Sequence, residues 1–168
     1  EGPPNRAYLK LYEALTLAGR TPQPGEFCLD VGGSPGGWAW VIHQCGADVL
    51  SIDRSPLSPS VANLKGVSFQ KRDAFSLLPK EFEQEGQSVD WLFSDLICYP
   101  EKLYEWVLQW LESGRCKNFI CTLKFKGEPD LSIIHKFAAL PDSRVLHLFN
   151  NKNELTWFKI SPSVSSGL

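Results

Sequence analysis

The sequence has no long apolar run. Its longest apolar stretches, residues 119–123 and 145–149, have the length of a strand, whereas a helix that crosses a bilayer needs about 18 or more apolar residues. Residues 1–4 carry neither a basic start nor an apolar segment, so no secretory signal is visible, although the absence of an initiating methionine leaves room for an upstream segment. We therefore expect no membrane span and a cytoplasmic location.

Cysteine and histidine are too few and too scattered for a disulfide framework or a metal site. The five cysteines are odd in number, and no two have the close spacing of a zinc knuckle or a redox motif. The three histidines are scattered as well, and we expect no metal. The cysteines are predicted to be small buried apolar residues in a reducing compartment.

The chain also lacks the excess of positive charge that RNA-binding domains often carry. Its formal net charge is −2 and its pI is about 5.9. Lysine and arginine do gather locally within residues 65–72, 115–117 and 124–126. Each cluster taken alone is most simply a group of solvated charges, so composition neither predicts nor excludes a nucleic-acid partner.

Length and composition are those of an ordinary globular domain. Apolar residues make up 43% of the 168 residues and charged residues 21%, which excludes disordered, collagen-like and coiled-coil chains. A chain of this size can bury its own core. We expect a single domain over residues 1–161, followed by a flexible tail at 162–168.

Helices and strands are predicted to alternate along the chain. Apolar residues at three- and four-residue spacing predict helices, whereas short apolar runs bounded by turn residues predict strands. This alternation predicts an α/β fold with a mostly parallel seven-stranded sheet, helices on both faces, and a C-terminal hairpin that adds one antiparallel strand at the edge. The helices are expected at 6–18, 38–45, 100–111 and 130–140, with a polar helical stretch near 81–85, and the strands at 27–31, 49–52, 67–70, 89–94, 119–125, 144–149 and 155–160.

A glycine-rich turn follows the first predicted strand, where open parallel sheets bind their ligands. It is not a dinucleotide fingerprint, because Ser34 stands where the middle glycine should be and Pro35 has no N–H to donate to a phosphate. Nor is it a Walker A loop, because Trp38 stands where that loop has its lysine. The turn comprises Gly32, Gly33, Ser34, Pro35, Gly36, Gly37 and Trp38.

Residues 32–36 of this turn also spell the G-x-S-x-G of a hydrolase nucleophile elbow. Ser34, Asp130 and His147 would follow in the chain order of a serine hydrolase triad. The residue after the nucleophile must donate its backbone N–H to the oxyanion, and Pro35 has none. A hydrolase that uses Ser34 is therefore a distant alternative.

Aspartates stand at or just after the ends of three later strands. Asp53 lies about 20 residues past the turn, where an acidic side chain can accept hydrogen bonds from a ribose diol. Asp73 and Asp95 follow the third and fourth strands. For Asp53 alone a turn-capping role is equally good, but together with the turn and Asp73 it favours a nucleoside ligand without phosphates.

These segments together resemble the FtsJ-like ribose 2′-O-methyltransferases over nearly the whole chain. Within that family the likeness is greatest to the catalytic domain of a member that acts on ribosomal RNA. That member carries RNA-binding domains ahead of its catalytic part, so an accessory RNA-binding domain or protein is a further possible partner. The likeness rests on residues 6–11, 29–38, 94–96, 123–128 and 153–156, of which the Pro-Gly-Gly-Trp turn is the most specific.

The resemblance implies a Rossmann-like class I fold and transfer of a methyl group from S-adenosylmethionine to a ribose 2′-hydroxyl of RNA, with ribosomal RNA as the expected substrate. It places the methionine moiety at Gly32 to Trp38, the cofactor ribose at Asp53 and the adenine amino group at Asp73, with Asp95 also beside the cofactor. The family's catalytic tetrad corresponds to Lys10, Asp95, Lys124 and Glu154.

By the same resemblance Lys124 is the base that takes the 2′-hydroxyl proton. A lysine with an ordinary pKa near ~10.4 is a poor base until its surroundings favour the neutral amine. Lys10 and the positive sulfur of the cofactor would act in that direction, whereas Asp95 and Glu154 act against it and are assigned to orientation. A module that binds cofactor or RNA without transferring methyl groups is the alternative, disfavoured because all four tetrad positions are occupied.

Overall fold

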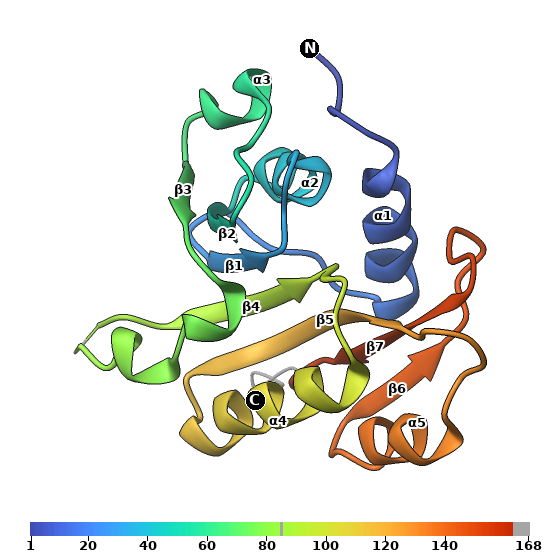
Figure 1. Ribbon diagram of the computed structural model, residues 1–168. Helices are drawn as coiled ribbons and strands as arrows, with labels where there is room; N and C mark the ends of the chain where they lie inside the picture. Colours follow the sequence, from blue (N-terminus) through green and yellow to red (C-terminus); the bar gives the residue numbers. More distant parts are fainter. Residues whose placement is uncertain (85, 163–168) are drawn as a thin grey trace, which may run out of the picture.

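The computed structural model describes residues 1–84 and 86–162, which contain one seven-stranded sheet (Figure 1). The strand order is β3-β2-β1-β4-β5-β7-β6. Strands β1 to β5 are parallel to one another, and β7 is antiparallel to both of its neighbours, β5 and β6. The strands are β1 (Phe27–Val31), β2 (Asp48–Asp53), β3 (Val67–Lys71), β4 (Val89–Ser94), β5 (Cys116–Lys124), β6 (Ser143–Leu146) and β7 (Glu154–Lys159).

All seven predicted strands are present, but the antiparallel strand does not lie at the edge. β6 is the edge strand, and β7 returns between β5 and β6 and is hydrogen-bonded to both. The crossover from β5 through helix α5 (Leu131–Ala138) to β6 leaves room for one strand between β5 and β6, and β7 occupies it. Trp157 and Phe158 of β7 are buried as a result.

Helices cover both faces of the sheet, as the alternation predicts. Helices α1 (Ala7–Ala18), α2 (Gly37–Gln44) and the short α3 (Pro59–Ala62) pack on one face, and α4 (Pro100–Ser113) and α5 pack on the other (Figure 1). The sequence analysis did not predict α3, and the stretch expected near 81–85 is the single 3₁₀ turn Pro79–Phe82.

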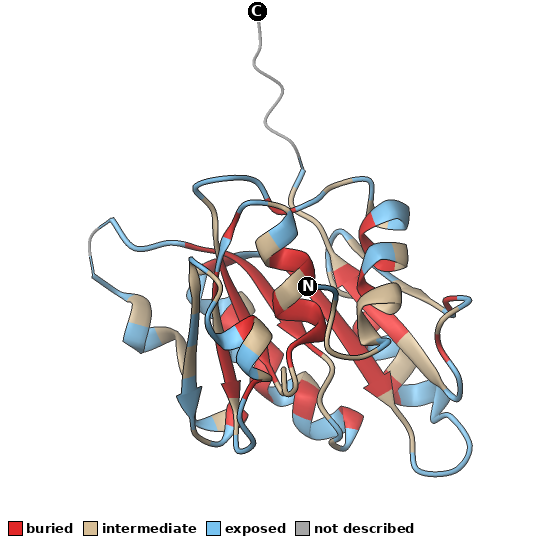
Figure 2. Cartoon of the chain, turned by 90° about the horizontal axis from the view of Figure 1, so that it is seen from above, coloured by how far each residue is buried: buried red, intermediate tan, exposed pale blue. Residues whose placement is uncertain are grey.

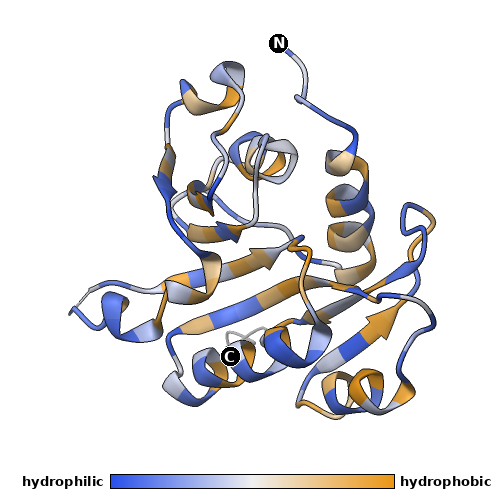
Figure 3. Ribbon diagram, viewed as in Figure 1, coloured by the Kyte–Doolittle hydropathy of each residue, from blue (hydrophilic) through white to orange (hydrophobic). Residues whose placement is uncertain are grey.

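The core therefore has two parts, one on each side of the sheet. Successive residues of β4 divide between them, with Trp91 and Phe93 facing α1 and α2 and Leu92 facing α4. Figure 2 shows the buried residues concentrated along the central strands, and Figure 3 shows that hydrophobic residues are frequent on those strands. Strand β4 is buried along its whole length, as a central parallel strand requires.

Local sequence signals end the helices where expected. α1 and α4 each end at a glycine in the left-handed conformation, Gly19 and Gly114. The Asp130 side chain caps the start of α5 by accepting from the Ser132 N–H.

Cys28, Cys116 and Cys121 are buried as predicted, whereas Cys45 and Cys98 are only partly buried. Within the described residues no helix is long and apolar enough to cross a membrane. Of the predicted tail at 162–168, residues 163–168 lie outside the described part.

Candidate active site

A cavity of about 640 Å³ opens at the carboxyl ends of the parallel strands. Its position follows from the topology, because loops leaving adjacent parallel strands diverge and leave a crevice at this edge. The loops after β1, β2, β3 and β4 contribute to its wall, together with Lys124 at the end of β5. It is lined by Asn5, Ala7, Asp30, Gly32, Gly33, Ser34, Gly37, Trp38, Asp53, Arg54, Arg72, Asp73, Ala74, Phe75, Asp95, Leu96, Ile97, Cys98, Tyr99, Lys102 and Lys124.

The glycine-rich turn forms the floor of this cavity between β1 and α2. A Cβ atom on Gly33 would overlap the Asp30 carboxylate and the Ser51 hydroxyl, so only glycine lets the turn lie against the strand ends. The Trp38 indole donates its N–H to the carbonyl of Ala7 at 3.0 Å, which ties α2 to the start of α1. Five of the seven predicted turn residues line the cavity; Pro35 and Gly36 do not.

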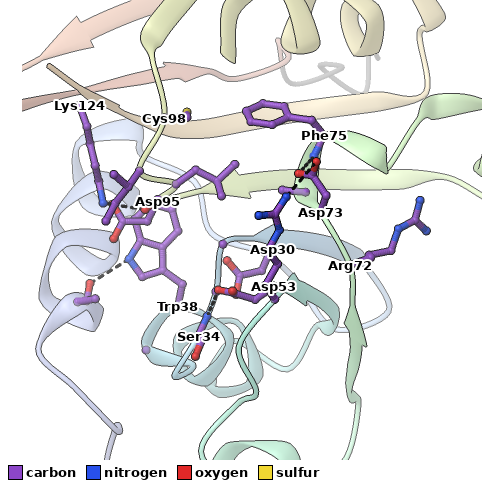
Figure 4. Close-up of a pocket in the computed structure, with 18 of the residues that line it drawn as sticks. Asp30, Ser34, Trp38, Asp53, Arg72, Asp73, Phe75, Asp95, Cys98 and Lys124 are labelled. Carbon is purple, nitrogen blue, oxygen red and sulfur yellow. Dashed lines mark hydrogen bonds and ion pairs between the residues drawn. The ribbon is translucent and has the colours of Figure 1, made fainter. Parts of the chain in front are cut away.

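The two predicted nucleoside-binding aspartates both line the cavity, with Asp53 beside Ser34 and Asp73 beside Phe75 (Figure 4). Asp53 accepts the backbone N–H of Ser34 at 2.9 Å and that of Ser55 at 3.0 Å, which holds its carboxylate at the turn. Asp73 accepts the Phe75 N–H at 3.1 Å. These hydrogen bonds leave lone pairs on both carboxylates free to accept from a ligand.

Sequence reasoning missed Asp30, the most deeply buried acidic group of the cavity. It is the penultimate residue of β1 and is 1% exposed. Oδ2 accepts the Ser51 hydroxyl at 3.2 Å, while Oδ1 is buried without a protein partner. Burial raises the pKa of Asp30 to about 7, although the Ser51 hydrogen bond acts in the opposite direction. The sequence did contain a signal for this site, because Asp30 is the one charged residue of an otherwise apolar strand and stands next to its end.

The basic side chains of the cavity wall, in contrast, already have partners. Arg54 lies 3.6 Å from Asp73, Arg72 pairs with Glu81 at 2.8 Å, and the Lys102 ammonium lies over the Phe75 ring. Of the four aspartates in the wall, Asp73 pairs with Arg54 and Asp95 with Lys124, whereas Asp30 and Asp53 form no ion pair. This arrangement suits a ligand that carries positive charge and hydrogen-bond donors, and it is unsuited to a pyrophosphate.

The four predicted tetrad residues meet at one end of the cavity. Lys124 ends β5 and donates to the backbone carbonyl of Asp95 at 2.7 Å, with its ammonium 3.4 Å from the Asp95 carboxylate (Figure 4). Lys10 of α1 lies 2.9 Å from the same carboxylate and also pairs with Glu154. Glu154 begins β7 directly opposite Lys124 in the β5–β7 pairing. Three strand ends and one helix thus bring together residues up to 144 positions apart in the sequence (Lys10 to Glu154).

The two lysines of the tetrad have different surroundings. Burial alone would lower the pKa of Lys10, but the carboxylates of Asp95 and Glu154 outweigh it, and the pKa lies above its ordinary value. Lys10 is therefore a permanent cation between two carboxylates. Lys124 lines the cavity, whereas Lys10 and Glu154 lie behind the wall.

The distant hydrolase alternative is wrong, because no hydrogen bond joins Ser34, Asp130 and His147. The Ser34 hydroxyl donates to the carbonyl of Pro56 at 2.7 Å, and Asp130 accepts from Ser132. His147 lies in the loop after β6, and its ring is hydrogen-bonded to the Lys152 carbonyl. Among the described residues no group of three or more His, Cys, Asp or Glu side chains could hold a metal ion.

Comparison with known proteins agrees with this geometry. Residues 3–147 match the family model described as FtsJ-like methyltransferase. The chain is 37% identical over 136 residues to the ribosomal RNA large subunit methyltransferase M of Halorhodospira halophila, which covers 79% of this chain and 38% of that protein. It is 30% identical over 176 residues to the protein of the same name from Alkalilimnicola ehrlichii, covering 97% of this chain and 47% of that protein.

The chain therefore spans less than half the length of these curated relatives. Among solved structures, a candidate ribosomal RNA methyltransferase of Plasmodium falciparum superposes with a TM-score of 0.65 at 14% identity, over 94% of this chain and 97% of that one. A candidate hemolysin of Lactococcus lactis gives a TM-score of 0.71 at 19% identity, over 92% and 86% of the two chains. At such identities the structures share the fold alone.

Proposed function

The chain belongs to the FtsJ-like methyltransferase family, and from that premise we propose that it transfers a methyl group from S-adenosylmethionine to a ribose 2′-hydroxyl of RNA. The observation that carries the proposal is the assembly of Lys10, Asp95, Lys124 and Glu154 at the end of a nucleoside-sized cavity. A pair of lysines held by two carboxylates offers one amine to the cavity and keeps the other fixed.

The cavity suits S-adenosylmethionine on three grounds. Asp30 and Asp53, which form no ion pair, match a ligand whose sulfonium and amino groups are positive, and the arginines of the wall are engaged within the protein. Asp53 and Asp73 are placed to accept from the ribose hydroxyls and the adenine amino group. The buried, unpartnered oxygen of Asp30 needs a donor, and we assign the ligand's amino group to it.

The cofactor supplies a methyl group on a positive sulfur, and the protein's part is to place and deprotonate the hydroxyl that attacks it. Lys124 would accept the 2′-hydroxyl proton as that oxygen takes the methyl group, which the bound cofactor would supply, leaving S-adenosylhomocysteine. Asp95 orients Lys124 through its backbone carbonyl, and Lys10 fixes Asp95 and Glu154.

Charge balance gives a physical reason for Lys124 to act as the base. Lys10 contacts the carboxylates of both Asp95 and Glu154, whereas Lys124 contacts only that of Asp95, at 3.4 Å. A bound sulfonium would add a positive charge beside Lys124, the less compensated of the two lysines.

We propose ribosomal RNA as the substrate, in agreement with the printed names of the relatives, and the cytoplasm as the place of action. The relatives are more than twice as long as this chain. An accessory RNA-binding domain or protein is therefore part of the proposal, and it would supply affinity that the acidic net charge of this chain does not.

Calorimetry and a methylation map test the proposal. S-adenosylmethionine should bind and NAD should not, and cellular RNA from a strain that lacks the gene should lose one or more ribose methyl groups relative to the parent strain. Binding of NAD in place of S-adenosylmethionine would contradict the cofactor assignment. Loss of methylation on a base nitrogen or on a protein would contradict the ribose assignment.

A further inference from the structure

A second cavity lies on the other side of the tetrad from the cofactor cavity. It measures about 470 Å³ and is formed by the loops at 125–130, after β5, and at 147–153, between β6 and β7. Glu154 forms part of its wall, so a tetrad residue belongs to it. Its lining consists of Gly127, Glu128, Pro129, His147, Lys152, Asn153, Glu154 and Leu155.

The strand order separates the two cavities along one edge of the sheet. The cofactor cavity lies over the ends of β3, β2, β1 and β4 and reaches Lys124 of β5. The tetrad lies at the ends of β4, β5 and β7. The second cavity lies over the ends of β5, β7 and β6. A methyl group that arrives from the first side must meet an acceptor from another direction, because in-line transfer needs nucleophile and leaving group on opposite sides of the carbon. The second cavity lies in that direction.

Phe149 lies on the same β6–β7 loop, two residues after the cavity-lining His147, and is 94% exposed. The loop that carries it is held firmly. Glu13 of α1 accepts the backbone N–H groups of Phe149 at 2.7 Å and Asn150 at 2.9 Å, and the Asn150 side chain donates to it at 2.8 Å. An exposed aromatic ring on a fixed backbone loses little freedom when a ligand covers it.

The loop is also joined to the tetrad. Asn151 is buried, accepts the Leu148 N–H at 2.9 Å and donates to the Glu154 carboxylate at 3.3 Å. Most of the exposed large apolar residues also lie after the ends of these strands. The described residues include six of them, and four follow the ends of β4, β5 and β6: Ile97, Tyr99, Leu131 and Phe149. A single exposed apolar residue needs no explanation, but a group beside a site indicates contact with a partner.

We propose that the second cavity and Phe149 bind the RNA strand next to the acceptor ribose, with a base stacked on the Phe149 ring and Lys152 near a phosphate. The inference rests on the proposed function and adds the position of the acceptor strand. RNA is the occupant because Glu154 joins this cavity to the tetrad, where the ribose must lie, so the neighbouring nucleotides come to its rim. Aromatic stacking with any base is the usual contact for single-stranded RNA.

The test compares Phe149→Ala, Phe149→Trp and the control Leu17→Ala, which removes an exposed apolar side chain of α1 outside both cavities. Ribosomal RNA from cells that lack the gene is the substrate for methyl transfer, and a fluorescein-labelled mixed-sequence RNA oligonucleotide is the binding probe. Phe149→Ala should raise KM for RNA and weaken oligonucleotide binding by about tenfold, with kcat and S-adenosylmethionine affinity unchanged. Phe149→Trp should restore both values.

Glu13→Ala releases the loop without touching the ring, and it should weaken RNA binding in the same direction. The inference is overturned if Phe149→Ala binds RNA as Leu17→Ala does, which is the result expected for a ring that contacts a protein, or if it loses cofactor affinity as well. A wild-type protein that binds the oligonucleotide but transfers no methyl group would contradict the proposed function alone. The comparison of variants in the binding assay would still decide the role of Phe149.

Discussion

Lys124 carries the chemical step at the scale of a single residue. Its amine lines the cofactor cavity and is oriented by the Asp95 carbonyl at 2.7 Å. Lys124→Ala removes the group that accepts the hydroxyl proton, so turnover should fall by a general-base factor of about 100 or more while S-adenosylmethionine affinity barely changes. Single-turnover methyl transfer and calorimetry measure the two quantities.

Lys124→Arg separates a base from a positive charge. A guanidinium stays protonated and cannot accept the proton, so this variant should be as inactive as Lys124→Ala. If Lys124 were only a phosphate contact, arginine would restore much of the activity. An active arginine variant would remove Lys124 from the mechanism and leave the tetrad without its base.

Asp30 predicts a pH dependence of stability. Burial raises the pKa of its carboxyl from the ordinary 3.8 to about 7, so between these values the folded state binds a proton that the unfolded state has lost. The free energy of unfolding of the ligand-free protein should therefore decrease as pH rises through this range, and the loss should be complete above the folded pKa.

Asp30→Asn should remove this dependence, because the amide cannot ionise and its oxygen can still accept from Ser51. At pH 8 the variant should be more stable than the wild type by roughly 1–4 kcal/mol, and at pH 4 nearly equal to it. Urea unfolding at the two pH values measures this. The same variant should bind S-adenosylmethionine more weakly; equal affinity would contradict the assignment of Asp30 to the ligand's amino group.

At the scale of elements, the turn between β1 and α2 determines where the cofactor cavity lies. A Cβ atom on Gly33 would overlap Asp30 and Ser51, which belong to two adjacent strands, so Gly33→Ala must displace the turn. We expect a loss of roughly 1–3 kcal/mol in the free energy of unfolding, together with weaker cofactor binding.

Gly2→Ala is the matched control, because a Cβ atom there has nothing within 4 Å. It should change neither quantity. If Gly33→Ala lost stability but kept full cofactor affinity, the turn would be a packing element and would not position the ligand. Calorimetry on both variants, beside urea unfolding, distinguishes these results.

The whole molecule should respond to the cofactor as one cooperative unit, because the cavity is built from the ends of five adjacent strands and the loops after four of them. Saturation to 100 times Kd adds about 2.7 kcal/mol to the free energy of unfolding. For a chain of this size we expect a rise of roughly 5–10 °C in Tm with S-adenosylhomocysteine. NAD should give no shift, and Lys124→Ala should shift as much as the wild type; a flat response to S-adenosylhomocysteine would contradict the cofactor site.

Much of this molecule follows from short-range patterns in its sequence. Apolar runs and helical periodicity predicted all seven strands and the helices α1, α2, α4 and α5, because an element that buries one or both faces must repeat apolar residues at its own period. The turn was predicted from its glycine-rich motif after the first strand, and the tetrad residues were predicted from the resemblance to the FtsJ-like family. Their roles in catalysis and binding stay predictions until the variants are measured.

Other features were decided only by tertiary structure. The place of β7 between β5 and β6 depends on which strands pair over long range, and the local pattern of a buried strand is the same at either position. The raised pKa of Asp30 depends on packing that excludes water from around its carboxylate. The second cavity and the fixed Phe149 depend on Glu13 of the first helix meeting a loop 136 residues later, a contact that no local pattern encodes.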